Sequence, residues 1–423
     1  MAYQSLDDWL AWQTTLHARE IELGLDRIEK VAQRLNLLSC PFTVITVAGT
    51  NGKGSSVAML SSILAAAGYC VGSYTSPHIL KYNERIKVNL NTVDDDELCA
   101  SFVKIDQARQ DISLSFFEFA TLTALDIFHQ KKVDVAILEV GLGGRLDATN
   151  IIDNDLAIVT SVGMDHMEWL GDDRESIGFE KAGILRTHKP AVCSDAQPPT
   201  SIQQVAQQKQ AQLHQLGQHF NYQINASSWN FSSQKNSYNK LPLPNLVGAV
   251  QVQNAAGVLM GLECLQSTLT VTEQAIRQGL QRLELAGRFQ RLQRDCEVIL
   301  DVAHNQDSAN NLAANLSAHP AKGKTVAVFA VLSDKDVNSI VESVSAHIDE
   351  WYISVVNSAR GMALEQVQQA LNKHNPDAVI EPFASVSLAY EGALAAAAPS
   401  DRVLVFGSIF TVSEVLAQEN VCA

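Results

Sequence analysis

Residues 44–55 read Val-Ile-Thr-Val-Ala-Gly-Thr-Asn-Gly-Lys-Gly-Ser, a β-branched run that passes into a glycine-rich turn. We predict a strand over 42–48 and a helix over 56–67, which ends at Gly68. A glycine loop between a strand and a helix turns backbone N–H groups toward a phosphate chain, and Lys53 adds a positive charge for the terminal phosphates. A bare glycine turn is the alternative, but the lysine inside the loop favours nucleotide binding.

The same alternation of strands and helices runs through most of the chain. Ahead of residue 195 we predict a helix over 116–129 and largely apolar strands over 69–74, 133–140 and 156–161. The alternation restarts after Gly287, with strands predicted over 298–302, 325–332, 351–356, 378–383 and 402–406. Continuous apolar strands separated by helices are typical of parallel sheets that are covered on both faces.

The chain has 423 residues, enough for two domains with separate cores. Residues 1–40 have helical periodicity, whereas 195–245 are rich in Gln, Asn and Ser and are interpreted as peripheral structure on the first domain, followed by a helix over 250–265. We therefore predict an α/β protein with a phosphate-loop domain over 1–285 and a smaller doubly wound domain over 286–423.

Composition excludes several classes of function. The formal net charge is −15, from 31 Lys and Arg against 46 Asp and Glu, which argues against a nucleic acid or an anionic membrane as partner. The seven cysteines are scattered without a Cys-x-x-Cys pair, so neither a disulfide framework nor a zinc site is indicated. No apolar stretch approaches the length needed to cross a bilayer, and the N-terminus has no targeting pattern, so we expect a cytoplasmic protein.

Candidate magnesium ligands follow three of the predicted strands. Glu139 lies at the end of the strand over 133–140, where a carboxylate would face a nucleotide crevice and can bind magnesium. Ser76 and His166 lie in loops at the same predicted edge, and they can complete the ligand shell, although histidine is an unusual ligand for this metal. A salt-bridged acid and a structural histidine are the alternatives; the three residues in combination favour a metal.

These segments together resemble one family. The segments that carry the resemblance are 49–55, 76–78, 139–150, 165–166, 180–183 and 301–305. They resemble the folylpolyglutamate synthases, and more closely the bacterial bifunctional dihydrofolate synthase/folylpolyglutamate synthases of the Mur ligase-like superfamily. The resemblance spans both predicted domains and keeps the order of the motifs. It implies a Mur ligase-like phosphate-loop domain and a C-terminal Rossmann-like glutamate-ligase domain.

The resemblance implies a magnesium-dependent ligation driven by ATP in folate biosynthesis and one-carbon metabolism. A substrate carboxylate attacks the γ-phosphate, and the acyl phosphate is captured by the α-amine of L-glutamate. The acid is dihydropteroate in one activity and the γ-carboxyl group of a folate in the other. Two Mg²⁺ ions and ATP as co-substrate are implied, with a monovalent cation as a further candidate. The implied partners are these small molecules only, and the implied state is a monomer.

Site residues are implied by position. For ATP they are Thr50, Asn51, Gly52, Lys53, Gly54, Ser55, Asn254, Arg288 and Asp301. The implied metal ligands are Ser76, Glu139, His166 and Lys181, the last in a carbamylated form, and the implied catalytic residues are Lys53, Lys181, Arg288 and His304. For dihydropteroate they are Asp26, Arg27, Ser115, Phe116, Phe117, Glu118, Leu146, Asp147 and Ala148.

Two of these assignments have plain structural alternatives. Lys181 could be an ordinary surface lysine, whereas a carbamate would turn its cation into a metal-binding anion. Phe116 and Phe117 could stack on a flat heterocycle or could simply be core residues, and their spacing does not decide between the two.

Three other functions share part of this pattern. A cell-wall amino-acid ligase shares the phosphate loop and the lysine, but those enzymes generally carry a further domain ahead of the loop, and we expect no room for it before Gly49. A folylpolyglutamate synthase without the first activity is a second rival. The third is a non-catalytic ATP-binding regulator of the same fold, because a fold alone does not establish a function.

Overall fold

The computed structural model describes residues 5–19 and 21–421, which form two compact units. Unit 1 comprises Met1–Gly163, Met167–Asn245 and Gln251–Leu283, and unit 2 comprises Met164–His166, Leu246–Val250 and Glu284–Ala423. The break near Leu283 lies close to the predicted domain boundary. Two short segments nevertheless group with unit 2, although they are embedded in the sequence of unit 1.

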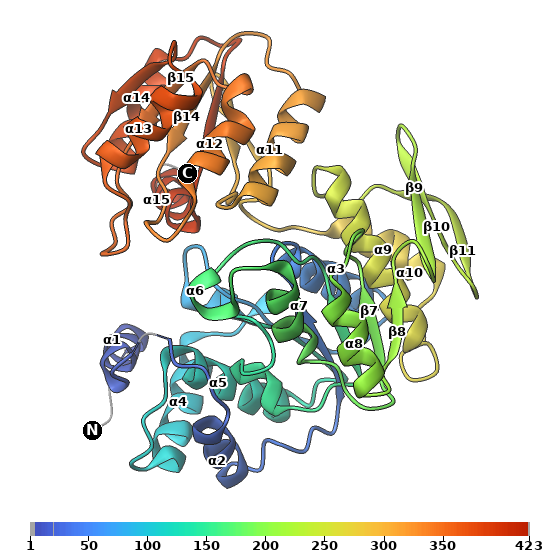
Figure 1. Cartoon of the computed structure of the whole chain (residues 1–423). Helices are drawn as coiled ribbons and strands as arrows, with labels where there is room; N and C mark the ends of the chain where they lie inside the picture. The colour runs from blue at the N-terminus through green and yellow to red at the C-terminus, as the bar shows by residue number, and fades with distance from the viewer. Residues whose placement is uncertain (1–4, 20, 422–423) are drawn as a thin grey trace. The chain divides into compact units, whose positions relative to one another are not determined.

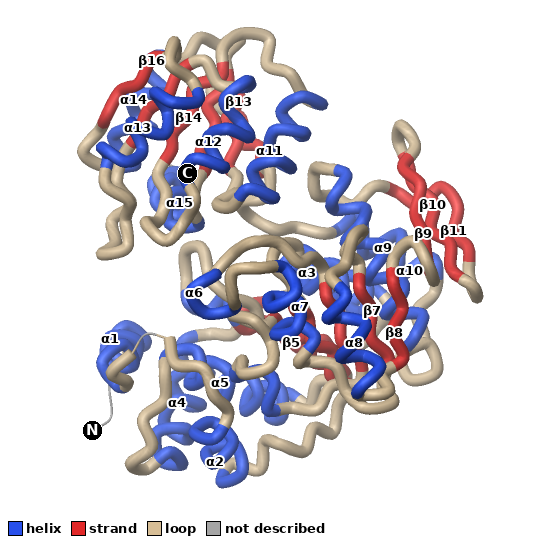
Figure 2. The backbone as a smooth tube through the Cα atoms, viewed as in Figure 1, coloured by secondary structure: helices blue, strands red, loops and turns tan. Residues whose placement is uncertain are grey.

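Unit 1 is built on an eight-stranded sheet with the order β4-β3-β2-β5-β1-β6-β7-β8. Figure 2 draws the strands in red and labels β5, β7 and β8 of this sheet. Its strands are β1 (Thr43–Ala48), β2 (Val71–Tyr74), β3 (Ile86–Val88), β4 (Asn91–Thr92), β5 (Val135–Glu139), β6 (Leu156–Val159), β7 (Pro190–Cys193) and β8 (Gln212–Gln215). The pairings β2-β5, β5-β1, β1-β6, β6-β7 and β7-β8 are parallel. At one edge, β3 pairs antiparallel with β2, and β4 pairs antiparallel with β3. The four strands predicted here, β1, β2, β5 and β6, are parallel to one another as expected, and the antiparallel edge strands β3 and β4 were not predicted.

Helices cover both faces of the sheet in unit 1 (Figure 1). They are α1 (Leu6–Leu16), α2 (Asp26–Arg34), α3 (Lys53–Ala66), α4 (Asp95–Arg109), α5 (Phe116–Lys131), α6 (Met167–Leu170), α7 (Arg174–Ala182), α8 (Thr200–Gln208), α9 (Ala249–Cys264) and α10 (Glu273–Arg282), with short 3₁₀ turns at Tyr82–Arg85 and Ala148–Ile151. Ala136 and Leu138 of β5 join the core that α4 and α5 form. Because side chains alternate along a strand, Val135 and Ile137 face the opposite side, where α3 packs.

The segment over 195–245 is more ordered than its composition indicates. It contains α8, the edge strand β8 and a separate three-stranded sheet of β9 (Phe220–Ile224), β10 (Ser228–Ser233) and β11 (Ser237–Pro242). Trp229 and Phe231 of β10 are buried, and the residue between them is not. Because only one face of such a sheet is apolar, the hydrophobicity of the whole segment is low, and composition alone does not reveal the strands.

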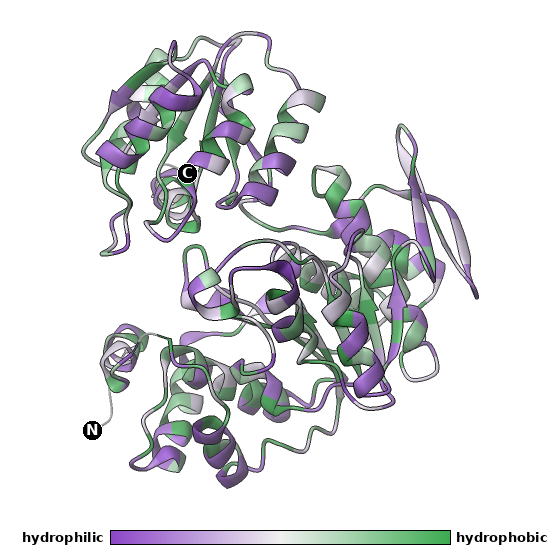
Figure 3. Ribbon diagram, in the orientation of Figure 1, coloured by the Kyte–Doolittle hydropathy of each residue, from purple (hydrophilic) through white to green (hydrophobic). Residues whose placement is uncertain are grey.

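Unit 2 contains a six-stranded sheet with the order β12-β13-β17-β14-β15-β16. Its strands are β12 (Gln290–Gln293), β13 (Glu297–Leu300), β14 (Thr325–Phe329), β15 (Glu350–Ile353), β16 (Val379–Pro382) and β17 (Arg402–Phe406); its helices are α11 (Gln306–Ala318), α12 (Val337–Val344), α13 (Leu364–His374), α14 (Val386–Ala396) and α15 (Ile409–Val421), with a 3₁₀ turn at Ser345–His347. All pairings are parallel except that of β12 with β13. Figure 3 shows the apolar strands of this sheet between more polar helices. Phe329, Trp351 and Phe406 belong to its core.

No helix among residues 5–19 and 21–421 is long and apolar enough to span a membrane.

Candidate active site

The phosphate loop is held in shape by the loop that follows β6. Only glycine fits at position 49, because an added Cβ would lie 1.8 Å from the hydroxyl oxygen of Thr160. The Thr160 and Ser161 hydroxyls both donate to the Asn51 carbonyl oxygen, at 2.7 and 3.0 Å. The Thr50 amide in turn donates to the Ser161 carbonyl oxygen at 2.7 Å. Thr160 and Ser161 were missed in the sequence because their role depends on the pairing of β1 with β6.

The loop leads into α3 three residues earlier than predicted. Gly52 has a φ of +87°, which favours glycine, and α3 begins directly after it at Lys53. The ammonium group of Lys53 donates to the carbonyl oxygens of Gly49 and Thr50, at 2.9 and 3.2 Å. Residues 53–55 therefore form the first turn of the helix, where amide groups can bind phosphate oxygens.

Asn254 of α9 lies against this loop. A Cβ on Gly52 would come within 2.6 Å of its side-chain oxygen, and Asn254 itself is buried, with its amide donating to Gln251 at 3.2 Å. The two residues are far apart in the sequence. Unit 1 thus brings together the predicted ATP contacts from the phosphate loop and from α9.

Glu139 and Ser76 are neighbours at the carboxyl ends of β5 and β2. The Glu139 carboxylate is buried and accepts a hydrogen bond from the Ser76 amide at 3.3 Å. Carboxylate and hydroxyl oxygens are donors that suit magnesium, and these neighbouring residues supply one of each. Among the residues that the structure describes, no group of three or more His, Cys, Asp or Glu side chains is arranged to hold a metal ion. His166 groups with unit 2, so the three-residue set stays a prediction.

His78, in the loop with Ser76, is held in its neutral form. The Arg85 guanidinium donates to Nδ1 of His78 at 2.8 Å. Burial, and then the positive charge of Arg85, lower the pKa of His78 to about 4. The imidazole therefore accepts a hydrogen bond at neutral pH.

This shift predicts a pH dependence of stability. The native pKa of about 4 lies below the ordinary histidine pKa of 6.5, so the unfolded chain binds more protons between these values and stability falls as the pH is lowered through them. Because His78 is partly exposed, we expect about 1–2 kcal/mol rather than the full shift. Urea unfolding of His78→Gln without nucleotide should show a shallower loss between about pH 7 and pH 4 than the wild type. His347→Gln in unit 2 controls for the loss of a histidine, and a slope unchanged in His78→Gln would contradict the prediction.

Lys181 is buried near the end of α7, with 3% of its surface exposed. The reading as an ordinary surface lysine is therefore wrong. The turn of glycines after β5 packs against the same end of α7, because a Cβ on Gly144 would meet the Glu180 carbonyl oxygen at 2.8 Å, and the Arg145 amide donates to that oxygen at 2.8 Å. Burial of a lysine is costly for the ammonium form, whereas a carbamate would be an anion.

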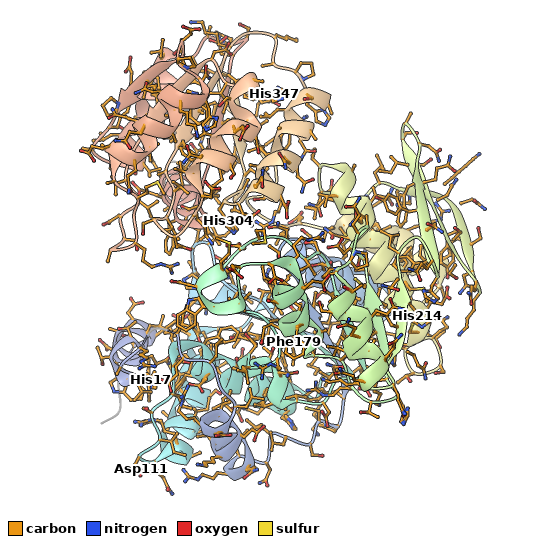
Figure 4. All side chains as sticks on the ribbon, viewed as in Figure 1. His17, Asp111, Phe179, His214, His304 and His347 are labelled. Atoms are coloured by element: carbon orange, nitrogen blue, oxygen red, sulfur yellow. The ribbon has the colours of Figure 1, made fainter. Side chains whose placement is uncertain are left out.

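A polar network joins the first helices to α5. Arg27 forms an ion pair with Glu22 and lies 3.2 Å from Glu118, which is buried. His17 completes the network, with its two ring nitrogens 3.1 Å from Glu22 and 3.0 Å from the Ser113 hydroxyl (Figure 4 labels His17). Glu22 and His17 were missed because they lie in or next to the irregular segment between α1 and α2. Asp26 is exposed at the start of α2.

The other residues predicted for dihydropteroate fall around the start of α5 and the loop after β5. Ser115 and Glu118 form the capping box of α5. Asp147 is buried and accepts hydrogen bonds from the amides of Leu142 and Thr149, and burial raises its pKa. Leu146 accepts from the Gly24 amide at 3.3 Å, and Ala148, next to Asp147, is buried.

Phe116 and Phe117 are half-buried, so neither is fully enclosed in the core. The Phe116 ring lies under the Arg85 guanidinium at 5.3 Å. The Phe117 ring packs so closely on Gly141 that a Cβ there would be 2.7 Å away. Both rings keep an accessible part, which leaves room for stacking.

In unit 2, Arg288, Asp301 and His304 lie around the start and the carboxyl end of the β12–β13 hairpin. Asp301 accepts hydrogen bonds from the Phe289 and Ala303 amides, both at 2.9 Å. Burial raises the pKa of Asp301, although the charge of Arg288 opposes the rise. His304, labelled in Figure 4, has Nδ1 2.8 Å from the Val302 carbonyl oxygen.

Comparison of the sequence with known proteins identifies its family. The family model described as Mur ligase middle domain matches residues 47–261, and the model described as Mur ligase, glutamate ligase domain matches 287–409. A curated relative, dihydrofolate synthase/folylpolyglutamate synthase of Escherichia coli (strain K12), is 44% identical over 98% of this chain and 96% of its own.

Two solved structures are similar over nearly the whole chain. E. coli FolC in complex with DHPP and ADP has a TM-score of 0.94 at 44% identity, with 100% of this chain and 99% of that one covered. A bifunctional folylpolyglutamate synthase/dihydrofolate synthase with Mn, AMPPNP and L-glutamate bound has a TM-score of 0.91 at 43% identity, with 99% of each chain covered.

The two sheets and the phosphate loop thus define an ATP-dependent ligase of the Mur ligase class. Within this class, the chain belongs to the dihydrofolate synthase/folylpolyglutamate synthase family.

Proposed function

We propose that this ligase joins L-glutamate to two acids, dihydropteroate and the γ-carboxyl group of folates. The observation that carries the proposal is similarity over nearly the full length to bifunctional enzymes, one of them solved with DHPP and ADP and another with Mn, AMPPNP and L-glutamate. ATP is the co-substrate and a divalent metal ion is required. Dihydrofolate is the first product, and polyglutamylated folate is the second.

The reaction needs two bond-forming steps. An oxygen of the acid carboxylate attacks the γ-phosphorus of ATP, so that ADP leaves and an acyl phosphate forms. The α-amine of L-glutamate then attacks the acyl carbon, phosphate leaves, and the nitrogen loses a proton as the amide forms. The protein contributes mainly by positioning reactants and by neutralising charge on the phosphoryl group.

The residues of unit 1 suit the first step. The first turn of α3 and Lys53 would bind the phosphates, with Asn254 closing on the loop from α9. Glu139 and Ser76 would hold the metal ion, which supplies positive charge to the phosphates when it is bound. Lys181 would take up CO₂, release a proton and present a carbamate to a second ion. In unit 2, the resemblance assigns Arg288 and Asp301 to ATP and His304 to the reacting groups.

The pteridine end of the acid is assigned to the network around Arg27 and to the half-buried rings of Phe116 and Phe117. Replacing Arg27 by Met would leave the Glu22 and Glu118 carboxylates without their shared cation. We expect the KM for dihydropteroate to rise roughly 10-fold while the KM for ATP stays within about twofold, since a lost charged hydrogen bond costs about 1–3 kcal/mol. Steady-state kinetics with each substrate varied would measure both constants.

Arg34→Met is the matched control, because Arg34 lies at the other end of α2 and donates only to backbone carbonyl oxygens of α4 among its described hydrogen bonds. Equal KM values for dihydropteroate in the two variants would remove the network from the substrate site.

The dual activity is tested by the release of ADP from Mg-ATP in the presence of L-glutamate. Dihydropteroate and tetrahydrofolate are supplied in separate reactions. Turnover with both acids supports the bifunctional enzyme, and turnover with tetrahydrofolate alone reduces it to a folylpolyglutamate synthase. If no ADP is released with either acid, the non-catalytic regulator is favoured.

The remaining assignments are part of the same proposal. The domain over 1–285 would bind ATP and the acid, and the domain over 286–423 would present L-glutamate. We expect a monomer in the cytoplasm, and light scattering that gives the mass of a single chain would support this state.

A further inference from the structure

Asp165 is the centre of a buried polar cluster in unit 2. Its Oδ1 lies 2.6 Å from the ammonium group of Lys335, and its Oδ2 accepts from the Asn305 side-chain amide at 3.1 Å. Nε2 of His304 lies 3.5 Å from the same Oδ2. Asp165 therefore connects the loop after β13, which carries residues 304 and 305, with the loop after β14, which carries residue 335.

The charges in this cluster are matched. The side chain of Lys335 is only 6% exposed, and its ammonium group also lies 3.2 Å from Asp334, which receives a hydrogen bond from Arg360 at 3.1 Å. Burial acts to raise the pKa of Asp165, but the hydrogen bond from His304 and the nearby positive charges outweigh it and hold the pKa well below its usual range. A buried ion pair with additional hydrogen bonds sets one geometry, because either partner alone would be a costly buried charge.

Two features tie this geometry to His304. The imidazole has one nitrogen beside the Val302 carbonyl oxygen and the other beside Asp165, so the ring plane is set while 34% of the side chain stays exposed. Asn305 uses its side-chain oxygen to cap α11, through the Ser308 amide at 3.0 Å, and its side-chain nitrogen to bind Asp165. A shift of Asp165 would therefore move His304 and the start of α11 together.

We propose that Asp165, anchored by Lys335, is a positioning residue that holds His304 and the start of α11 in the arrangement ligation requires. Asp165 acts through His304 and Asn305 rather than by touching substrate. The inference rests on the proposed function, since it gives His304 a place at the reacting centre.

The test compares wild type with Asp165→Asn, His304→Ala and the double variant of these two. Asp165→Asn should lower kcat roughly 30-fold or more and leave the KM for ATP within about twofold, because a misplaced group costs turnover rather than nucleotide binding. In the double variant the loss should be smaller than the product of the two single losses, since residues that act through one another are not additive. Equal kcat in Asp165→Asn and wild type, or additive losses, would overturn the proposal.

Arg402→Met is the structural control. Arg402 is also buried and pairs with Glu297 at 2.8 Å, but this pair lies at the amino ends of β17 and β13. The thermal midpoint of Arg402→Met should fall about as far as that of Asp165→Asn, while kcat of Arg402→Met stays near the wild-type value. A similar loss of kcat in Arg402→Met would reduce Asp165 to a stabilising role.

Two further measurements keep the outcome decisive. If Asp165→Asn does not fold, Asp165→Asn combined with Lys335→Met removes both charges and avoids an unpaired buried ion, and it should show the same kcat loss. The magnesium concentration for half-maximal rate should not change in Asp165→Asn; an increase that restores full kcat at saturating magnesium would show that Asp165 acts through His166 and overturn the proposal. Absence of ADP release by the wild type itself would instead contradict the proposed function.

Discussion

The Lys181→Ala enzyme is expected to bind ATP like the wild type and to lose ligation by roughly 10³-fold, the scale on which removal of a charged group at a phosphoryl-transfer site acts. Lys181 is buried on α7, so its replacement would remove an anion at the metal site if it carries a carbamate. Nucleotide titration by calorimetry and ADP release would measure the two effects separately. A ¹³C carbamate signal from wild type in labelled bicarbonate should disappear in the variant.

Lys189→Ala is the control for this prediction. Lys189 is another lysine of unit 1, but it is half-exposed and pairs with Asp155 at the surface. Its removal should change turnover by less than about twofold, as is usual for surface ion pairs. Normal turnover in Lys181→Ala would show the carbamate assignment to be wrong.

Glu139→Gln should impair the use of magnesium. Glutamine keeps the shape of the side chain but removes the negative charge beside Ser76. We expect the magnesium concentration for half-maximal rate to rise and kcat to fall by roughly 10²-fold, because a neutral amide is a much poorer ligand for this ion. Initial rates over a magnesium series at fixed ATP would measure both changes.

Asp134→Asn is the matched change at the opposite end of the same strand. Asp134 directly precedes β5 and accepts a hydrogen bond from the Cys70 amide at 2.7 Å. This variant should keep the magnesium dependence of the wild type. A wild-type magnesium curve for Glu139→Gln would mean that Glu139 is a structural acid.

The elements that sequence predicted best are those whose pattern is local. The strands β1 and β5 were visible as short, largely apolar runs, and the turn before α3 was marked by its glycines. The helix α4 was missed, although Asp94 and Glu97 form a capping box that marks its start. The antiparallel strands β3 and β12 are short, at three and four residues, and give no clear alternation.

The site was less predictable, because much of it depends on contacts between distant segments. The hydrogen bond from Lys335 to Asp165 joins residues 170 positions apart, and neither loop alone marks the pair. The same holds for Asn254 against Gly52. Arg27 and Glu118 could be named from the resemblance, whereas Glu22 became visible only when the chain between α1 and α2 was placed beside them.

The acyl phosphate is the central claim, and transfer of isotope tests it most directly. Dihydropteroate labelled with ¹⁸O in its carboxylate is incubated with the enzyme, Mg-ATP and L-glutamate, and the inorganic phosphate is analysed by mass spectrometry. Attack of the carboxylate on the γ-phosphate predicts one ¹⁸O atom in each phosphate released, because the bridging oxygen leaves with phosphorus. Phosphate without label, formed together with dihydrofolate, would contradict the account.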